Sequence, residues 1–371
     1  MDALPRAVIR THPGDFVVEE LPAYAPSGRG EHLYITFRKT GRTTMDAVRA
    51  IARALDVDAR GAGWAGLKDR HAITTQTVSF PLPMRRDAEV ALATTVSLPG
   101  IEVLEARRHD NRPKPGHLSG NRFTIALRGL SDSEASVVRA RLDEAAALGV
   151  PNAFGPQRFG RDGDNPERAL AWLAGRIDGP RDRREQRLLF SALQSLLFNR
   201  VLERRVSDGS WASVLAGDVA KKHDTGGLFT VPSTGPELED AQARAAAGSI
   251  SATGPMFGVK MRWPEEVPLA IEREVLDGAI GDPSLLARAR NLGEGTRRAL
   301  RLMVSNLTVA PLPAGAGLEV AFVLPKGGYA TTVLATACRL DDASAKRSAG
   351  AGEQPTDDGE PAVTEAEPAS D

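Results

Sequence analysis

Alternation of hydrophobic and polar residues predicts several β-strands. Residues 32–38, 121–128 and 317–325 place their large apolar side chains at every second position, and residues 73–80 are rich in β-branched residues. Successive side chains of a strand point to opposite faces, so this pattern is typical of half-buried strands. The segment 329–336, YATTVLAT, has a similar character and is also expected to be a strand.

Hydrophobic residues at helical spacing lie between these strands. Residues 45–56 carry one apolar stripe, and Thr43 or Thr44 can cap the first turn. A second helix is expected between Ser131 and Gly149, because Ser-Asp-Ser-Glu is a capping-box pattern and glycine before proline ends helices. The longest helical run, 186–206, has a wide apolar stripe formed by Leu189, Leu193, Leu196, Leu197 and Val201.

The order of these elements indicates the domain organisation. Predicted strands fill roughly the first 150 residues and return at 317–336, whereas the middle is helix-rich with Gly- and Pro-containing loops. We therefore expect an α+β fold in which one domain, residues 1–150 and 304–340, is interrupted by a mostly helical insertion at 151–303.

Composition is that of an ordinary globular protein. Of 371 residues, 42% are hydrophobic and 26% charged, and the single cysteine excludes an internal disulfide. The first residues contain no apolar stretch typical of a signal peptide, and no segment approaches the roughly 20 apolar residues that span a bilayer. We expect a cytoplasmic protein without a membrane partner.

Charge is unevenly distributed along the chain. Residues 341–371 hold nine acidic and two basic residues, a net charge of −7, which leaves +6 on the remainder because the whole chain is −1. This tail has almost no large apolar residue, so we expect it to be disordered and dispensable. Of the 47 basic residues 39 are arginine, which suits phosphate binding but also fits a simple compositional bias.

Two familiar types of site are poorly supported. Residues 61–66 match G-x-G-x-x-G, but a helix is predicted before this run and a strand after it, which inverts the order of a dinucleotide-binding unit. The six histidines form no metal-binding spacing, and no cysteine pair exists. Neither a cofactor nor a metal is expected.

The loop of residues 66–72, GLKDRHA, is a better candidate. Asp69 stands between Lys68 and Arg70 in a glycine-flanked loop just before a predicted strand. Neighbouring cations favour the ionised carboxylate, and such a group can attack an anomeric carbon or an electron-poor ring. From spacing alone, an aspartate that caps a turn beside two solvated cations is the favoured explanation of the loop.

Further segments occur with this loop in a fixed order. They are residues 13–20, 30–39, 65–76, 118–128, 149–165, 180–183 and 324–334. Together they resemble the motifs of the TruD family of tRNA pseudouridine synthases, whose catalytic aspartate lies in G-x-K-D-[KR]-x-A-x-T. The resemblance runs from about residue 9 to 336, with departures at Gly14, at Leu67 and after Tyr329.

The resemblance implies a fold, an activity and a set of site residues. The fold would be the mixed or antiparallel sheet of pseudouridine synthases with a TruD-type insertion. The activity would be isomerisation of a uridine, position 13 in the D arm of tRNA, by a monomer that needs no cofactor. Asp69 would start glycosidic cleavage on a flipped-out uridine. Substrate-binding roles would fall to Lys68, Asn121, Phe123, Arg158 and Tyr329, with Arg161 as a second phosphate contact.

Simpler explanations of these residues remain open. Phe123 alternates with Ile125 and fits a core position, Asn121 fits a turn at a strand start, and Arg158 fits a solvated cation beside packed phenylalanines. At the level of function, the alternatives are the same reaction on another RNA, a non-catalytic RNA-binding protein, and the nucleotide-cofactor enzyme suggested by the glycine run.

Overall fold

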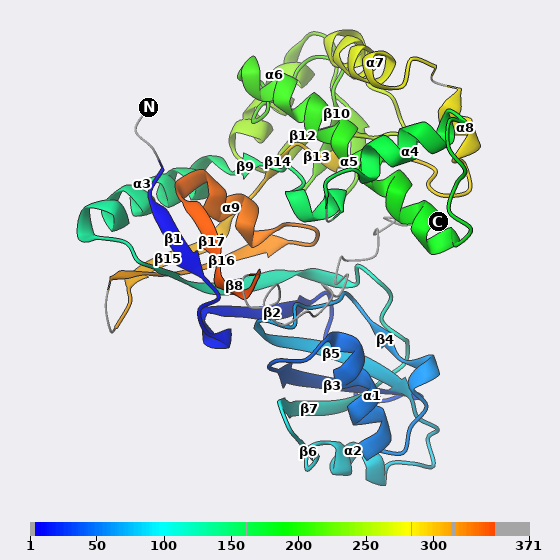
Figure 1. Cartoon of the computed structure of the whole chain (residues 1–371), viewed down its shortest axis with the longest axis vertical. Coiled ribbons are helices and arrows are strands. Elements are labelled where there is room, and N and C mark those ends of the chain that lie inside the picture. The colour runs from blue at the N-terminus through cyan, green and yellow to red at the C-terminus, as the bar shows by residue number, and fades with distance from the viewer. Residues whose placement is uncertain (1–3, 161, 283, 314–315, 346–371) are drawn as a thin grey trace. The chain divides into compact units, whose positions relative to one another are not determined.

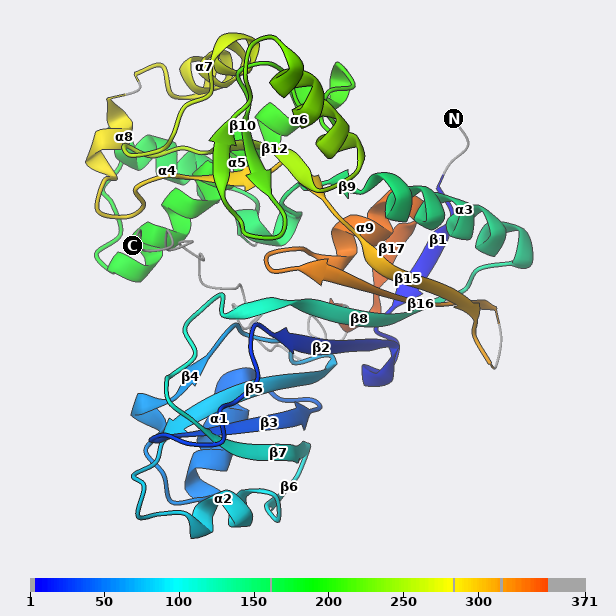
Figure 2. The ribbon, with the colours of Figure 1, turned by 180° about the vertical axis from the view of Figure 1, so that it is seen from behind.

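The computed structural model describes residues 4–160, 162–282, 284–313 and 316–345 (Figures 1 and 2). The described chain divides into two compact units. The first contains the residues up to Ala146 and those from Val304 onward, and the second contains Ala147–Met303. The first unit is therefore discontinuous in sequence.

The first unit is built on a mixed β-sheet. Its described strands are β1 (Arg6–Ile9), β2 (Phe16–Pro22), β3 (His32–Lys39), β4 (Gly63–Trp64), β5 (Ile73–Pro81), β6 (Ser97–Leu98), β7 (Ile101–His109), β8 (Leu118–Arg128), β15 (Ser305–Pro311), β16 (Gly317–Pro325) and β17 (Arg339–Asp342). The main path runs β15-β16-β8-β2-β5-β3-β7-β6, with β2 and β5 parallel and the other neighbours antiparallel. This arrangement, with its helices, confirms the predicted α+β class.

Helices complete the first unit. They are α1 (Thr44–Ala54), α2 (Ala88–Ala93), α3 (Asp132–Leu148) and α9 (Ala330–Ala337), with short 3-10 turns η1 (Pro13–Asp15) and η2 (Ala59–Gly61). The apolar stripe of α1 packs on alternate residues of β3, which forms a buried core that includes Leu33, Ile35, Phe37, Val48 and Ile51. The predicted caps are confirmed, because Thr43 accepts from the Asp46 amide and the Ser131 amide donates to Glu134.

The expectation of a strand at 329–336 is wrong. This segment forms α9, whose buried side chains are those of Ala330, Val333, Leu334 and Ala337. Their spacing of three and four residues is helical, and the β-branched threonines that suggested a strand lie between them. The chain therefore returns to the sheet through β15, β16 and β17 rather than through 329–336.

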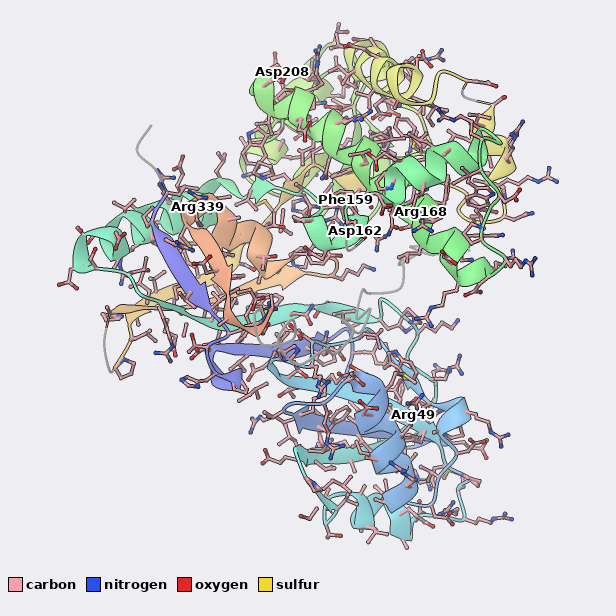
Figure 3. All side chains as sticks on the ribbon, in the orientation of Figure 1. Arg49, Phe159, Asp162, Arg168, Asp208 and Arg339 are labelled. Atoms are coloured by element: carbon pink, nitrogen blue, oxygen red, sulfur yellow. The ribbon has the colours of Figure 1, made fainter. Side chains whose placement is uncertain are left out.

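The predicted fold boundary near Leu340 also needs correction. Arg339–Asp342 form β17, which pairs in parallel with β1, and the strand start at Arg339 is labelled in Figure 3. The first two acidic residues of the predicted tail thus belong to the sheet. The rest of the predicted disordered segment, from residue 346, lies outside the described residues.

The second unit combines helices with a small sheet. Its described elements are β9 (Val150–Pro151), η3 (Pro156–Phe159), α4 (Asn165–Leu173), α5 (Arg183–Ser207), β10 (Val219–Lys222), β11 (Leu228–Thr230), α6 (Pro236–Ala246), β12 (Ile250–Met256), α7 (Glu266–Ile280), α8 (Leu285–Arg288), β13 (Thr296–Ala299) and β14 (Arg301–Leu302). The core gathers around α5, with Phe190, Leu193 and Leu197 packed against Phe257 and Leu276.

The sheet of this unit was not predicted from the sequence. Within the described residues its strands run β11-β10-β12-β13, all antiparallel. Its central strand β12 contains Gly254 and Pro255, which usually argue against a central strand. A Cβ at Gly254 would lie within 3.0 Å of Leu300 and Phe198 atoms, so close packing requires the glycine.

Candidate active site

The loop that carries Asp69 is fixed through its backbone. The buried Lys39, the last residue of β3, donates from Nζ to the carbonyl oxygens of Lys68 at 3.2 Å and Asp69 at 2.7 Å. The Lys68 amide donates to Thr44 Oγ1 at 2.9 Å, which ties the loop to the first turn of α1. A loop held on both sides by buried groups positions its side chains well.

The Asp69 carboxylate is held but accessible. Arg10 Nη2 lies 2.8 Å from Asp69 Oδ2, and the His71 amide donates to Asp69 Oδ1 at 2.8 Å. The Asp69 side chain is 35% exposed, whereas that of Arg10 is 15% exposed. The two donors hold the carboxylate in a fixed position, and the exposure leaves room for an approaching reactant.

Arg10 is itself held from two sides. It has a φ of +57°, a conformation that costs most L-residues about 1–2 kcal/mol, and its guanidinium stacks 4.1 Å above the Phe16 ring. Its Nη1 lies 2.5 Å from Asp342 Oδ2 on β17. Burial opposes ionisation of Asp342, but hydrogen bonds from Ser344 and the Arg10 charge lower its pKa overall. Arg10 therefore bridges two carboxylates, Asp69 and Asp342.

A second polar group lies buried beside the loop. Lys68 Nζ donates to Asn121 Oδ1 at 2.7 Å and lies 3.3 Å from Glu20 Oε2. Glu20 on β2 and Asn121 on β8 are direct cross-strand partners, so Lys68 contacts both members of one pair. The Lys68 and Glu20 side chains are 5% and 4% exposed, which makes this an internal charge pair. Lys68 thus orients Asn121 rather than reaching solvent.

Phe123 and Tyr329 occupy different environments. Phe123 is 7% exposed, and its ring lies between Phe16 at 6.3 Å and Phe322 at 5.7 Å. Phe123 pairs with Phe322 across β8 and β16, and Asn121 pairs with Leu324 in the same register. Tyr329 follows the turn at the end of β16, is half-buried, and is the N-cap residue of α9.

Arg158 lies in the second unit. Its Nε donates to Ser195 Oγ at 3.2 Å, a second nitrogen contacts Ser191 Oγ, and its guanidinium lies 5.6 Å from the Phe154 ring. Both serines belong to α5. Lys68, Asp69, Asn121 and Phe123, by contrast, come together in the first unit. Arg161 lies outside the described residues.

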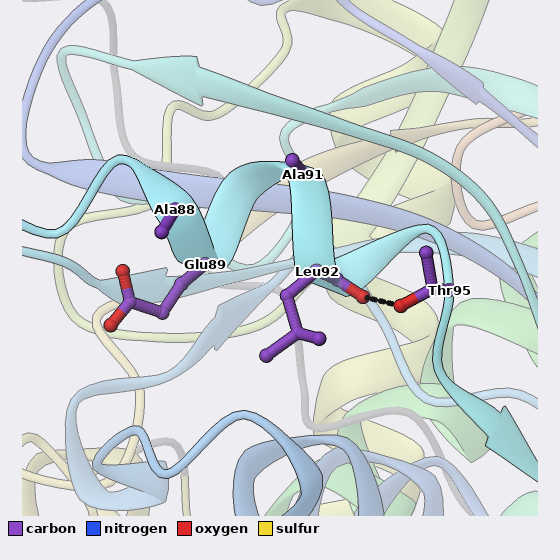
Figure 4. Close-up of a pocket in the computed structure, with 5 residues that line it drawn as sticks. All are labelled: Ala88, Glu89, Ala91, Leu92 and Thr95. Atoms are coloured by element: carbon purple, nitrogen blue, oxygen red, sulfur yellow. Dashed lines mark hydrogen bonds between the residues drawn. The ribbon is translucent and has the colours of Figure 1, made fainter.

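Two observations concern other kinds of site. Among the described residues no group of three His, Cys, Asp or Glu side chains is arranged to hold a metal ion. An open hollow of about 460 Å³ on α2 is lined by Ala88, Glu89, Ala91, Leu92 and Thr95 (Figure 4). Its only carboxylate, Glu89, pairs with Arg86 at 2.6 Å, so this hollow offers little chemistry.

No described helix has the length and apolar character required to cross a bilayer.

Sequence reasoning missed several residues of the site. Arg10 and Glu20 stand in or beside a strand with no local pattern that marks them, and Asp342 was assigned to the disordered tail. Alternation gave one usable signal. Lys39 falls on the apolar face of β3 with Leu33, Ile35 and Phe37, and a lysine at a core position requires a buried partner.

The fold is that of an α+β protein with a mixed sheet. Beside this sheet, a fixed loop presents an accessible carboxylate that is bound by an arginine. The model of the tRNA pseudouridine synthase D (TruD) family matches residues 6–168 and 182–336, and the chain belongs to this family. A relative from Anaeromyxobacter sp. (strain Fw109-5), named tRNA pseudouridine synthase D, is 47% identical over 332 residues, which cover 88% of this chain and 90% of the relative.

Two further comparisons agree with this assignment. A tRNA pseudouridine synthase D from Thermus thermophilus is 41% identical over 337 residues, with 90% of this chain and 89% of the relative covered. A crystal structure from Methanosarcina mazei, provisionally named tRNA pseudouridine synthase D, aligns with a TM-score of 0.71 at 23% identity. It covers 91% of this chain and 94% of that chain, and it shows the shared fold.

Proposed function

We propose that this protein is an isomerase that converts a uridine of tRNA to pseudouridine, with Asp69 as the nucleophile. Family membership and the names of the relatives support the reaction. The observation that carries the assignment of Asp69 is its geometry. It is an accessible carboxylate bound by Arg10, on a loop whose backbone is fixed by the buried Lys39.

The reaction requires no net redox change. The bond between N1 of uracil and C1′ of ribose breaks, the uracil turns, and a bond between C5 and C1′ forms. The hydrogen on C5 is lost to solvent and N1 gains a proton. Asp69 can attack C1′ or the uracil ring, and Arg10 would hold its carboxylate in position for either route. The uridine must leave its stack to reach Asp69, which implies base flipping.

The other residues would bind or orient the substrate. Tyr329, half-buried at the start of α9, would stack on the target uracil, a contact that contributes roughly 1–3 kcal/mol per base. Asn121 is oriented by Lys68 and would bind the base or its neighbour. Phe123 would support these groups from its packed position between Phe16 and Phe322. Arg158 would contact phosphate from the second unit.

The wider proposals follow from the same assignment. Residues 1–150 and 304–342, which include the whole of β17, would form the catalytic domain, and 151–303 the TruD-type insertion that helps to grip RNA. The target would be uridine 13 in the D arm. The enzyme would act as a cytoplasmic monomer without a metal or a cofactor.

Tritium release tests this proposal. Transfer RNA transcribed with uracil tritiated at C5 should release tritium when incubated with the purified chain, in the presence of a chelator and without nucleotide. Asp69→Ala should abolish release, because no other group can replace the nucleophile, and the variant should still bind the RNA. Release by Asp69→Ala at the wild-type rate would contradict the role of Asp69.

A further inference from the structure

A cluster of aromatic and histidine side chains lies at the other end of β3 from Lys39. The Tyr24 ring stacks on His109 with centroids 5.1 Å apart and planes inclined by 25°, and it meets His117 edge-on at 6.3 Å. Tyr34, on β3, packs edge-on against His109 at 4.7 Å. In addition to β3, three segments of the chain contribute side chains to the cluster. They are the β2–β3 connection, the end of β7 and the residue before β8.

The cluster packs against a buried tyrosine and presents one exposed tyrosine ring to solvent. Tyr34 is 5% exposed and donates to the Asn111 carbonyl at 2.8 Å, while its hydroxyl lies 3.3 Å from that of Tyr24. The Ser27 amide donates to His109 Nδ1 at 3.0 Å, which fixes the orientation of the ring. Tyr24, by contrast, is 39% exposed. An exposed ring that is held by the buried Tyr34 and the half-buried His109 can serve as a stacking surface.

Two lysines lie near the His117 side of this surface. Lys114 and Lys326, both exposed, are close enough to His117 to add to the effect of burial in lowering its pKa. The acidic residue in the cluster, Asp110, accepts from Ser27 Oγ at 2.9 Å and lies 3.8 Å from Arg29. Exposed lysines around an aromatic ring match a ligand with planar bases and a phosphate backbone.

The cluster is connected to the candidate active site. Lys326 lies in the turn between β16 and α9, three residues before Tyr329. His117 directly precedes β8, and Asn121 is the fourth residue of that strand, which corresponds to a distance of about 13 Å. One RNA chain can therefore reach both places.

We propose that Tyr24, His109 and His117, with Lys114 and Lys326, form a platform that binds a single-stranded stretch of RNA beside the target uridine. This rests on the proposed function for the identity of the RNA. Tyr24 would stack on an unpaired base, and the two lysines would contact phosphates.

Binding of the full-length chain to a fluorescently labelled tRNA transcript tests the platform. Tyr24→Ala should raise Kd about five- to hundredfold, the effect of removing one base–aromatic stack, and Tyr24→Phe should restore most of the affinity. Lys326→Ala should weaken binding and reduce the slope of log Kd against log salt by about 1. Arg49→Ala, which removes an exposed cation of α1 (Figure 3), is the control and should leave both quantities unchanged.

The outcomes separate the platform from the proposed function. Wild-type affinity in Tyr24→Ala, or an equal loss in Arg49→Ala, would overturn the platform. If Tyr24→Ala does not fold, Lys326→Ala decides, because it leaves the stack intact. A wild-type chain that binds tRNA without releasing tritium would refute the proposed function, while a binding loss in Tyr24→Ala would still support the platform.

Discussion

Each unit contains a carboxylate bound by an arginine, and the two pairs differ in their exposure. In the second unit, Glu272 and Arg297 form a bidentate pair at 2.7 and 2.8 Å, and their side chains are 3% and 1% exposed. Arg297 also donates to Thr253 at 2.9 Å. In the first unit, Asp69 is 35% exposed and meets Arg10 through one oxygen.

This difference fits a structural pair in the second unit and the proposed nucleophile in the first. Both oxygens of Glu272 face one buried guanidinium, so the pair fixes α7 to β13 and cannot be reached by a ligand. Asp69 is oriented by Arg10 and by the His71 amide and remains accessible. Removal of a partner should therefore cost stability in the second unit and turnover in the first.

The largest expected change in stability is that of Glu272→Ala. It leaves Arg297 buried without its carboxylate, and the free energy of unfolding should fall by about 3–5 kcal/mol. Glu274→Ala, on the same helix, is the matched control. Its carboxylate is 64% exposed and 3.7 Å from Arg204, so urea unfolding should show almost no change. Equal losses in the two variants would remove the distinction between the buried and exposed pairs.

Arg10→Ala should affect turnover more than folding. Without the guanidinium, Asp69 loses its orienting partner, and kcat for tritium release should fall about 10- to 100-fold with little change in KM. Arg6→Ala provides the control. Arg6 lies on β1, the strand that precedes Arg10, and its side chain pairs with Asp341 and is 71% exposed. A kcat equal to that of the control would show that Arg10 does not position Asp69.

Asp342→Asn should give a smaller, pH-dependent loss of stability. The pKa of Asp342 is lowered on folding, so its contribution is present above its ordinary pKa and is lost as the pH falls through the lowered value. The variant should lose about 1 kcal/mol at pH 7 and nothing at pH values below both pKa values. Unfolding curves at pH 7 and at successively lower pH measure this, and a loss independent of pH would assign the effect to packing.

Truncation should have the smallest effect. Removal of residues 346–371 leaves every described contact of β17 in place, so turnover and stability should match those of the full chain. Removal from Asp342 onward takes away the second partner of Arg10, the strand partner of Ile9 and the buried Ser344, so the loss at pH 7 should be at least that of Asp342→Asn. If the shorter truncation alone abolished turnover, the acidic segment would have a role that the described residues do not reveal.

The sequence predicted local structure better than long-range contacts. Strands 32–38 and 121–128 and the helix capped by Ser131 follow from alternation and capping, which are local signals. The prediction of a strand at 329–336 failed because a short run of small and apolar residues fits both the period of a strand and the period of a helix. The sheet of the second unit was missed because β12 contains Gly254 and Pro255, which tertiary packing tolerates.

The site was only partly predictable for the same reason. Lys68 and Asp69 lie in a recognisable loop, but their partners are far away in sequence. Arg10 is 59 residues from Asp69 and Asp342 is 332 residues from Arg10, and no local pattern marks such pairs. Burial decided the role of Lys68, which points to Asn121 inside the protein although its charge suggested a solvated residue.

The most direct test of the central claim is pseudouridine mapping in the tRNA of cells that lack the gene, complemented with either the wild-type chain or Asp69→Asn. The substitution keeps the size of the side chain and removes its charge. We predict that the wild-type chain restores one pseudouridine in the D arm, at position 13, and that Asp69→Asn accumulates as folded protein without restoring it. Restoration by Asp69→Asn, or no difference between deleted and complemented cells, would contradict the account.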